Sequence, residues 1–498
     1  MSNELYQLIA IILYMAAMLI IGYYAFRRTA NLTDYMLGGR SLGPAVTALS
    51  AGAADMSGWL LMGLPGLIYA YGLVEAWIAI GLSVGAYLNW LFVAPRLRVY
   101  TQVSNESITI PSFLENRLKD KSGLLRIVSG IIILIFFTFY ISSGMVAGGV
   151  FFESSFGLEY RTGLLIVSAV VVAYTLFGGF LAVSYTDFVQ GLIMFLALIL
   201  VPTFGIFLTG GFGETVASIR EVDPQLLNLV SGATVMGVIS SIAWGLGYFG
   251  QPHIIVRFMA ISSVRETKSA RRIGIGWMVL SLLGAIATAL VGIAYYQQNP
   301  GATLVDNEAV FIALGQVIFH PFIGGLMLAA VLAAVMSTIS SQLIVTSSAL
   351  IEDLYKAIIN KNATDKSYVF LGRMAVLVVS IVAAFLAWGD NDTILKLVSF
   401  AWAGFGASFG PIILLSLYWR KITTSGALSG MVTGAITVII WGNASWGGIE
   451  LTNVLYEIVP GFFIGLLVTV VVSLITYRPN VEIEQEFTDT IEKLSRER

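Results

Sequence analysis

The chain has 498 residues, of which 57% are hydrophobic and only 11% are charged, and its formal net charge is −2. A soluble globular protein carries about 25% charged residues, so this composition excludes a protein whose whole surface faces water. The small net charge gives no basic face for nucleic acid, and the absence of cysteine excludes disulfides, iron–sulfur clusters and thiol catalysis. We therefore expect one polytopic membrane domain.

Apolar stretches long enough to cross a bilayer follow one another along the chain. A spanning helix needs about 20 mainly apolar residues, and continuous apolar runs favour helices over barrel strands, which would alternate. We expect about thirteen spans on this criterion. Their approximate cores are 5–26, 41–68, 73–95, 124–151, 162–183, 186–209, 232–256, 273–296, 318–349, 369–388, 394–418, 424–442 and 453–477.

The distribution of positive charge predicts the orientation. The first stretch follows MSNELYQ, which has no positive charge, so we expect a membrane anchor rather than a cleaved signal. If the N-terminus is outside, every lysine and arginine except Arg161, Arg220 and Lys396 falls on the cytoplasmic side, as the positive-inside rule requires. We expect a multi-pass protein of the plasma (inner) membrane with a cytoplasmic C-terminus.

Two predicted spans are interrupted by glycine and proline. The second reads ALSAGAADMSGWLLMGLPG and the seventh reads SSIAWGLGYFGQPHIIVRFMA. Glycine weakens a helix by about 1 kcal/mol and proline by about 3 kcal/mol, and broken backbone survives in lipid only where it lines a cavity. The two spans start on opposite faces, five spans apart, which is typical of inverted repeats around a transporter's central site.

This organisation divides the chain into five parts. They are 1–40 (first span and cytoplasmic turn), 41–210 (repeat one, spans 2–6), 211–420 (repeat two, spans 7–11), 421–477 (spans 12–13) and 478–498 (a cytoplasmic tail, either an exposed helix or disordered).

Oxygen atoms near the first break indicate a cation site. Asp55 is the only acidic residue deep inside a predicted span, and an intramembrane carboxylate is costly and functional by default. The break would also free carbonyl oxygens such as those of Ala53 and Met56, which suit a hard cation. Alternatively, Asp55 pairs with Arg40, caps a half-helix or carries a proton.

The ninth predicted span supplies further oxygens. It reads GGLMLAAVLAAVMSTISSQLIVTSS, and Ala334, Ser337 and Thr338 share one helical face because they lie at i, i+3 and i+4. Together with Ala53 and Met56 they would form a five-oxygen site for Na⁺. The alternative is that these hydroxyls only bond carbonyls of their own helix.

Aromatic residues at the breaks indicate a solute site. Trp59, Trp244 and Tyr248 lie at the breaks, and Tyr140 lies mid-span in FFTFYISSGMVAGG. Aromatic faces pack an apolar body and half-helix N-termini attract a carboxylate, so a small zwitterion with an apolar side group is predicted. Each aromatic could instead serve packing or an interface belt.

Other motifs carry less weight. GLGYFG at 245–250 matches G-x-G-x-x-G but follows no strand, so a dinucleotide site is rejected. No P-loop or H-E-x-x-H segment occurs, and we expect neither an enzyme nor an organic cofactor. Asp187 is placed at a short cytoplasmic turn, where it caps span six or, as the alternative, gates the inner mouth.

The segments LGGRSLGPAVTALSAGAADMSGWLLMGLPG, YTLFGGFLAVSYTDFVQ, AWGLGYFGQPHIIVRFMA and LAAVMSTISSQL resemble the sodium/solute symporter family, from about residue 15 to 475. The resemblance implies an all-α polytopic protein with a five-plus-five inverted-repeat core of the leucine-transporter type. It implies Na⁺-coupled import of L-proline by alternating access, with no nucleic acid or obligate protein partner. Another small amino acid or a carboxylate is the alternative cargo.

The resemblance also implies residue roles. The sodium positions are Ala53, Asp55, Met56, Ala334, Ser337 and Thr338. The solute positions are Ser57, Gly58, Trp59, Tyr140, Trp244, Tyr248 and Pro252. The functionally sensitive inner-face positions are Arg40, Asp187 and Arg373.

Overall fold

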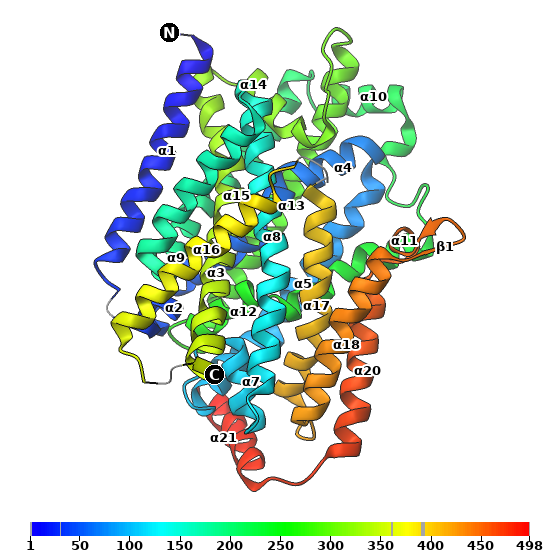
Figure 1. Cartoon of the computed structure of the whole chain (residues 1–498). Coiled ribbons are helices and arrows are strands. Elements are labelled where there is room, and N and C mark those ends of the chain that lie inside the picture. Colours follow the sequence, from blue (N-terminus) through cyan, green and yellow to red (C-terminus); the bar gives the residue numbers. More distant parts are fainter. Residues whose placement is uncertain (1, 30, 360–361, 390–393, 498) are drawn as a thin grey trace.

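A computed structural model describes residues 2–29, 31–359, 362–389 and 394–497. The described chain forms one elongated bundle of helices, with the start of α1 at one end and α21 at the opposite end (Figure 1). The first and the last helix of the described chain therefore reach opposite ends of the bundle.

The first half of the chain runs from α1 to the long helix α9, and η marks a short 3₁₀ or π segment. The bounds are α1 (Asn3–Phe26), α2 (Leu32–Leu37), η1 (Gly38–Arg40), α3 (Pro44–Asp55), η2 (Trp59–Gly63), α4 (Leu64–Tyr71), η3 (Leu73–Ala76), α5 (Trp77–Leu88), η4 (Asn89–Val93), α6 (Ala94–Val103), α7 (Ile110–Leu118), α8 (Leu124–Phe156) and α9 (Tyr160–Leu208).

The second half contains the central helix α15 and a small hairpin. The bounds are α10 (Phe212–Val222), η5 (Pro224–Leu227), α11 (Val235–Ala243), η6 (Trp244–Gly250), α12 (Pro252–Ala260), α13 (Glu266–Gln298), η7 (Asn307–Ala309), α14 (Val310–Ile318), α15 (Pro321–Ser348), η8 (Ala349–Ile359), α16 (Asp365–Leu386), α17 (Ile394–Tyr418), α18 (Thr424–Asn443), β1 (Ser445–Trp446), β2 (Ile449–Glu450), α19 (Leu451–Val454), α20 (Ile458–Thr476) and α21 (Val481–Glu497).

Ten helices in the described part of the chain are long and apolar enough to cross a membrane. The predicted all-α polytopic membrane architecture is thus confirmed. The count of thirteen stays a prediction, because α9 covers two predicted spans and each interrupted span is built from shorter helices.

The long helix α9 is bent at Gly179, which has φ 61° and ψ −153°. A straight helix of its 49 residues would be about 74 Å long, more than twice the thickness of a bilayer core of about 30 Å. A Cβ at Gly179 would lie 2.7 Å from the carbonyl oxygen of Tyr35, so only glycine fits there. The predicted boundary between 183 and 186 was therefore wrong by about one helical turn.

Both interrupted spans are broken where the sequence predicts. α3 ends at Asp55, Met56 leaves the helical region (φ −80°, ψ 66°), and the chain continues as η2 and α4. α11 ends at Ala243 and is followed by the 3₁₀ segment η6 and by Gln251 in an extended conformation. A Cβ at Gly247 in η6 would overlap Trp402 of α17, so glycine permits this close contact.

The helix α15 lies at the centre of the bundle. Every residue from 329 to 343 is at most 2% exposed, and α15 packs against α1, α3, α8 and α9. A helix that carries no charged side chain on any face belongs in such an interior position. This position makes α15 the partner of the first broken helix.

The C-terminal tail forms α21, which packs on the end of the bundle opposite the start of α1. Phe487 and Leu494 are buried, and Lys119 pairs with Glu482 at 3.0 Å and with Glu486. The helical alternative for the tail is confirmed, but the helix is docked rather than freely exposed.

Candidate functional site

The end of α3 and the middle of α15 meet at the first break. Ser337 Oγ lies 2.7 Å from the carbonyl oxygen of Ala53 and 3.1 Å from that of Ala334. Thr338 Oγ1 donates to the carbonyl of Ala334 at 3.2 Å. Four of the five predicted oxygens thus lie together at residues that are at most 2% exposed. Met56 lies in the break itself and lines the neighbouring cavity.

Gly58 brings the second half of this broken span close to two helices. A Cβ at Gly58 would lie 3.2 Å from Val335 Cγ2 on α15 and 3.4 Å from Ala147 Cβ on α8. Ser57 Oγ accepts from the backbone N–H of Trp59 at 3.2 Å, which supplies one of the missing partners at the start of η2. The break is therefore held by packing and by a local side-chain cap.

Asp55 connects the two broken spans. The Tyr248 hydroxyl in η6 donates a hydrogen bond to the Asp55 carboxylate. Arg40 does not pair with Asp55, so that alternative was wrong. Its guanidinium instead donates to the carbonyls of Ser107 at 2.6 Å and Met259 at 3.0 Å.

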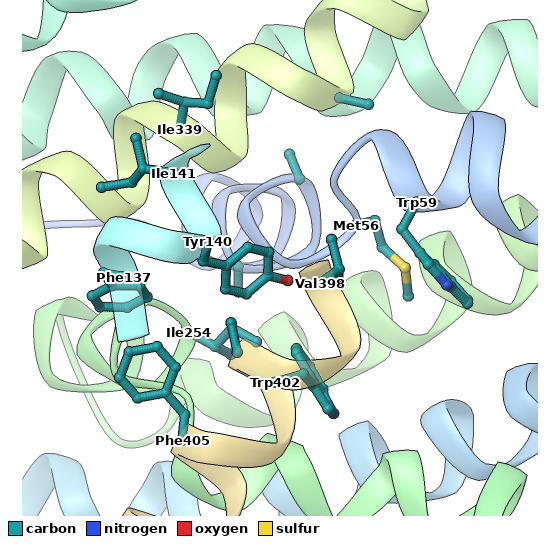
Figure 2. Packing of buried hydrophobic residues seen from close by; sticks show 14 of the residues in the cluster. Met56, Trp59, Phe137, Tyr140, Ile141, Ile254, Ile339, Val398, Trp402 and Phe405 are labelled. Atoms are coloured by element: carbon teal, nitrogen blue, oxygen red, sulfur yellow. The ribbon is translucent and has the colours of Figure 1, made fainter. Parts of the chain in front are cut away.

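A small cavity, with room for no more than about one water molecule, adjoins the first break. Figure 2 shows Met56, Trp59, Tyr140, Val398 and Trp402 projecting toward a common region from three different segments. The full lining set is Asp55, Met56, Ser57, Trp59, Leu82, Tyr140, Trp244, Val398 and Trp402.

The cavity wall is an aromatic stack. The rings of Trp59 and Trp244, one from each broken span, have centroids 6.0 Å apart and planes inclined by 28°. The indole N–H of Trp59 is buried and has no hydrogen-bond partner within the described chain. The cavity is therefore nearly closed, and its wall presents aromatic faces and one unpaired N–H group, which suit a molecule with an apolar body.

The residues predicted to bind solute are not all at this cavity. Trp59, Tyr140, Trp244 and Ser57 line it, whereas Gly58 lies behind the wall against α15. Tyr248 lines a neighbouring cavity on the other side of Asp55. Pro252 begins α12 one residue after the second break and is buried.

Sequence reasoning missed two wall residues from α17, Val398 and Trp402. Trp402 Nε1 donates to the carbonyl of Trp244 at 2.8 Å, and its ring meets that of Tyr248 edge-on at 5.1 Å. The segment AWAGFGASFG around Trp402 could have been a signal, since a tryptophan among small residues indicates a close helix contact.

Asp187 lies in a buried polar cluster. Its carboxylate accepts from Ser50 at 2.7 Å, from Arg257 at 3.0 Å and from Ser341 at 3.2 Å. These four side chains come from α3, α9, α12 and α15, and all are 0% exposed. The capping interpretation was wrong, because Asp187 lies inside α9, past the bend at Gly179. Arg257 was predicted only as a cytoplasmic charge.

Arg373 lies apart from this cluster and from the cavity. Its guanidinium stacks over the ring of Phe26 at 5.1 Å and donates to the carbonyl of Phe177 at 3.4 Å. Arg40, in η1 just before α3, joins this segment to the end of α12 through the carbonyl of Met259. Neither arginine lines the cavity between the two breaks.

Comparison with known proteins identifies relatives of nearly full length. The model of the sodium:solute symporter family matches residues 35–434. The high-affinity proline transporter PutP of Bacillus subtilis is 64% identical over 96% of this chain and 100% of its own length. The osmoregulated proline transporter OpuE of the same organism is 54% identical, with 96% of each chain covered. A sodium/proline symporter of Staphylococcus aureus is 52% identical over 96% of this chain and 94% of its own length.

Solved structures share the fold. A Na⁺-coupled sialic acid symporter in a substrate-bound outward-open state gives a TM-score of 0.81 at 20% identity, covering 95% of this chain and 98% of its own. The nucleobase-cation-symport-1 transporter Mhp1 gives 0.55 at 14% identity, covering 93% and 100%. The predicted leucine-transporter-type fold is therefore confirmed. With the family match across most of its length, the chain belongs to the sodium:solute symporter family and is a multi-pass membrane transporter.

Proposed function

We propose that this protein imports L-proline together with Na⁺ by alternating access. The single observation that carries the proposal is the contact between the end of the broken helix α3 and the hydroxyl-bearing turn of the central helix α15. It places carbonyl and hydroxyl oxygens, the ligands of a hard cation, beside a small aromatic cavity. The full-length relatives named as proline transporters support the choice of solute.

Na⁺ binds between the two helices. Its ligands are the carbonyls of Ala53, Met56 and Ala334 and the hydroxyls of Ser337 and Thr338. Asp55 raises the affinity for a cation by its charge, one residue away from the ligand carbonyl of Met56. Because a bound cation is shared by α3 and α15, it favours the arrangement in which the two stay in contact.

L-Proline occupies the cavity beside the cation. Its apolar ring packs against Trp59, Tyr140 and Trp244, and the free indole N–H of Trp59 is a donor for the carboxylate. Ser57 and Gly58 join the cation site to the solute site. Tyr248 and Pro252 shape the second break, and Tyr248 transmits the position of Asp55 to it.

Coupling follows because both ligands bind the same junction. If Na⁺ raises the affinity for proline, proline raises the affinity for Na⁺ by the same factor. Spans 2–6 and 7–11 act as the two inverted repeats that rock around this junction. The buried Asp187–Arg257 pair and the inner-face residues Arg40 and Arg373 hold the inner path closed.

The orientation places the N-terminus outside and the C-terminus in the cytoplasm. The positive charges on one side of the predicted spans support it, as do the opposite positions of α1 and α21 (Figure 1). The chemistry of import needs no organic cofactor, since the ion gradient supplies the driving force.

Uptake of labelled proline into proteoliposomes with an imposed Na⁺ gradient tests this function. The wild type should accumulate proline only with Na⁺ outside. The variant Ser337→Ala/Thr338→Ala should require at least tenfold more Na⁺ for half-maximal uptake, since two hydroxyl ligands are worth about 1.4 kcal/mol or more.

Ser348→Ala is the matched control, because Ser348 lies on the same helix and bonds only the carbonyl of Ile344 at 2.8 Å. Proline uptake that ignores Na⁺ in the wild type would overturn the function. Normal Na⁺ dependence in the double variant would overturn the site.

The alternative cargo is another small amino acid or carboxylate. Competition of labelled proline uptake by an unlabelled panel of such solutes separates the two. A solute that inhibits the uptake at a lower concentration than unlabelled proline does would replace proline as the proposed cargo.

A further inference from the structure

Arg126 forms a three-way ion pair on the inner side of the bundle. Its Nε lies 3.1 Å from Asp353, one terminal nitrogen lies 2.9 Å from Glu115, and the other lies 2.8 Å from Glu352. Each guanidinium nitrogen therefore meets a different carboxylate. Thr109 Oγ1 donates to the same Asp353 oxygen at 2.7 Å.

This network is enclosed by the protein. The side chain of Asp353 is 0% exposed, Glu352 is 8% exposed and Arg126 is 15% exposed. A partly buried pair of this kind is hard to break, because removing the cation leaves carboxylates buried without a counter-charge. The network therefore fixes the geometry of the segments that carry it.

Those segments are the helices that carry the proposed binding residues. Arg126 lies near the start of α8, which continues to Tyr140 in the cavity wall. Asp353 lies in η8, the direct continuation of α15, which carries Ser337 and Thr338. From the network to either site is about 14–16 residues of helix, or about 21–24 Å.

Along that distance the two helices are in close contact. A Cβ at Gly130 of α8 would lie 3.2 Å from Leu354, and a Cβ at Gly144 would lie 2.6 Å from Ile339 Cγ1. Figure 2 shows Ile141 of α8 and Ile339 of α15 on facing segments near the cavity. Small residues that let backbones approach are typical of membrane helix pairs. A shift at the inner end is therefore transmitted along the pair.

We infer that Arg126 is a positioning residue for transport, one that holds the solute-bearing helix α8 in register with the ion-bearing helix α15 through Asp353, Glu352 and Glu115. It touches neither ligand. Its loss allows α8 to slide or rotate against α15, which separates Tyr140 from the Ser337–Thr338 turn. This inference rests on the proposed function of those residues.

The first test is Arg126→Gln in proteoliposomes, with Na⁺ and proline titrated separately. Both half-saturation concentrations should rise about fivefold to thirtyfold, the range of couplings of about 1–2 kcal/mol between distant residues. The maximal uptake rate per folded molecule should fall less than twofold. Arg126→Lys should be intermediate, because one ammonium cannot meet three separate carboxylates.

Lys356→Gln is the matched control. Lys356 pairs with Glu352 at 3.0 Å on its own helix, at i+4, and its ammonium also lies 5.4 Å from the ring centre of Tyr368 on α16, so it adds to the network without bridging α8 and α15. Its half-saturation concentrations should stay within about twofold of wild type, since such pairs are weak. A purely structural role for Arg126 would lower the yield of folded protein and leave both concentrations unchanged.

The second test replaces the ion pair between α8 and η8 by a disulfide bond. A Cβ at Gly130 would lie 3.7 Å from Asp353 Cβ, and the Cβ atoms of a disulfide are about 3.8 Å apart. The chain has no other cysteine. Gly130→Cys/Asp353→Cys therefore breaks the network when reduced and ties α8 to η8 when oxidised. Asp353→Cys alone is the control for the oxidant.

Oxidation of the double-cysteine variant should return both half-saturation concentrations to within about threefold of wild type, whereas Asp353→Cys should stay impaired. Normal values for Arg126→Gln would overturn the inference, as would oxidation that forms the disulfide without restoring affinity. If wild-type uptake does not depend on Na⁺, the proposed function fails and takes this inference with it. If wild-type uptake depends on Na⁺ but Arg126→Gln has the half-saturation concentrations of the wild type, the inference fails while the proposed function stands.

Discussion

Ser337 Oγ on α15 lies 2.7 Å from the carbonyl oxygen of Ala53, although 284 positions separate the two residues. The contact falls two residues before the end of α3 at Asp55. An unravelled backbone in a membrane must find partners, and here one of them is a side chain of the most buried helix. The junction between these two residues is where the proposed ion site adjoins the proposed solute site.

The close approach of Gly58 to Val335 predicts a steric effect on ion binding. We expect Gly58→Ala to raise the Na⁺ concentration for half-maximal proline binding about fivefold or more, because overpacking costs about 1–3 kcal/mol. Gly276→Ala on α13 is the control, since a Cβ there meets nothing within 4 Å in the described structure. Equal Na⁺ dependence of the two variants would contradict the packing argument.

The hydrogen bond from Tyr248 to Asp55 predicts a loss of function in Tyr248→Phe. The change leaves a buried carboxylate short of a donor, and hydrogen bonds to charged groups contribute about 1.5–3 kcal/mol. We expect proline affinity to fall at least tenfold in equilibrium binding. Tyr23→Phe, at an exposed position of α1, controls for the loss of a hydroxyl. Unchanged affinity in Tyr248→Phe would show that the contact does not serve binding.

Because Trp402 lines the cavity, we expect its replacement to change the selectivity for the solute. Trp402→Phe removes the donor to the carbonyl of Trp244 and widens the cavity. We expect weaker proline uptake and stronger competition by amino acids with larger rings. The affinity ratio between such an amino acid and proline should shift by about 1–3 kcal/mol in favour of the larger ring. A competition profile identical to wild type would remove Trp402 from the solute wall.

The buried pair of Asp187 and Arg257 predicts a double-mutant cycle. Either Asp187→Asn or Arg257→Gln should destabilise the protein by about 3–5 kcal/mol, because each leaves an uncompensated buried charge. The double variant should lose less than the sum of the two. Thermal unfolding in detergent measures all four forms, and strictly additive losses would contradict a direct pairing.

Because ion pairs dock α21 on the bundle, we expect the stability of this docking to depend on the salt concentration. Burial alone would lower the pKa of the Lys119 ammonium, but its bonds with Glu486 and Glu482 raise that pKa above its ordinary value. A base whose pKa is raised on folding stabilises the docked state at every pH below its ordinary pKa, and that contribution is lost as the pH rises through the raised value.

The measurement is the labelling rate of Leu494→Cys, a buried position of α21. We expect Lys119→Gln to accelerate labelling, and salt to narrow the difference by screening. The ratio of the labelling rates with and without Lys119→Gln should be the same at about pH 6 and about pH 8, because Lys119 stays charged throughout. Arg496→Gln is the control, since its partner Glu492 lies on α21 itself.

Local signals explain what the sequence could predict. Glycine and proline in the second and seventh apolar runs report a property of the backbone itself, so both breaks were found at Met56–Ser57 and at 244–251. Ala334, Ser337 and Thr338 were predicted to share one helical face because they lie at i, i+3 and i+4, and the structure brings Ser337 of this face to Ala53. Such features need no knowledge of neighbouring helices.

The missed features depend on packing between distant segments. Trp402 lies in an unbroken helix and enters the wall only because α17 presses on η6. Arg257 was read as a cytoplasmic charge, although it is 0% exposed and paired. The error at Asp187 has the same origin as the misplaced boundary, because the bend lies at Gly179 and its tight fit against Tyr35 is a tertiary contact.

The bend at Gly179 also limits where the chain can accept inserted residues. The bend is made within a helical run at one residue, and Tyr35 fills the space beside it. An added epitope or reporter loop there would have to displace Tyr35 and unwind both arms, whereas the exposed turn around Asn299–Gly301 could accept it. Natural length variants and inserted tags should therefore be tolerated at the exposed turn and eliminated at the bend.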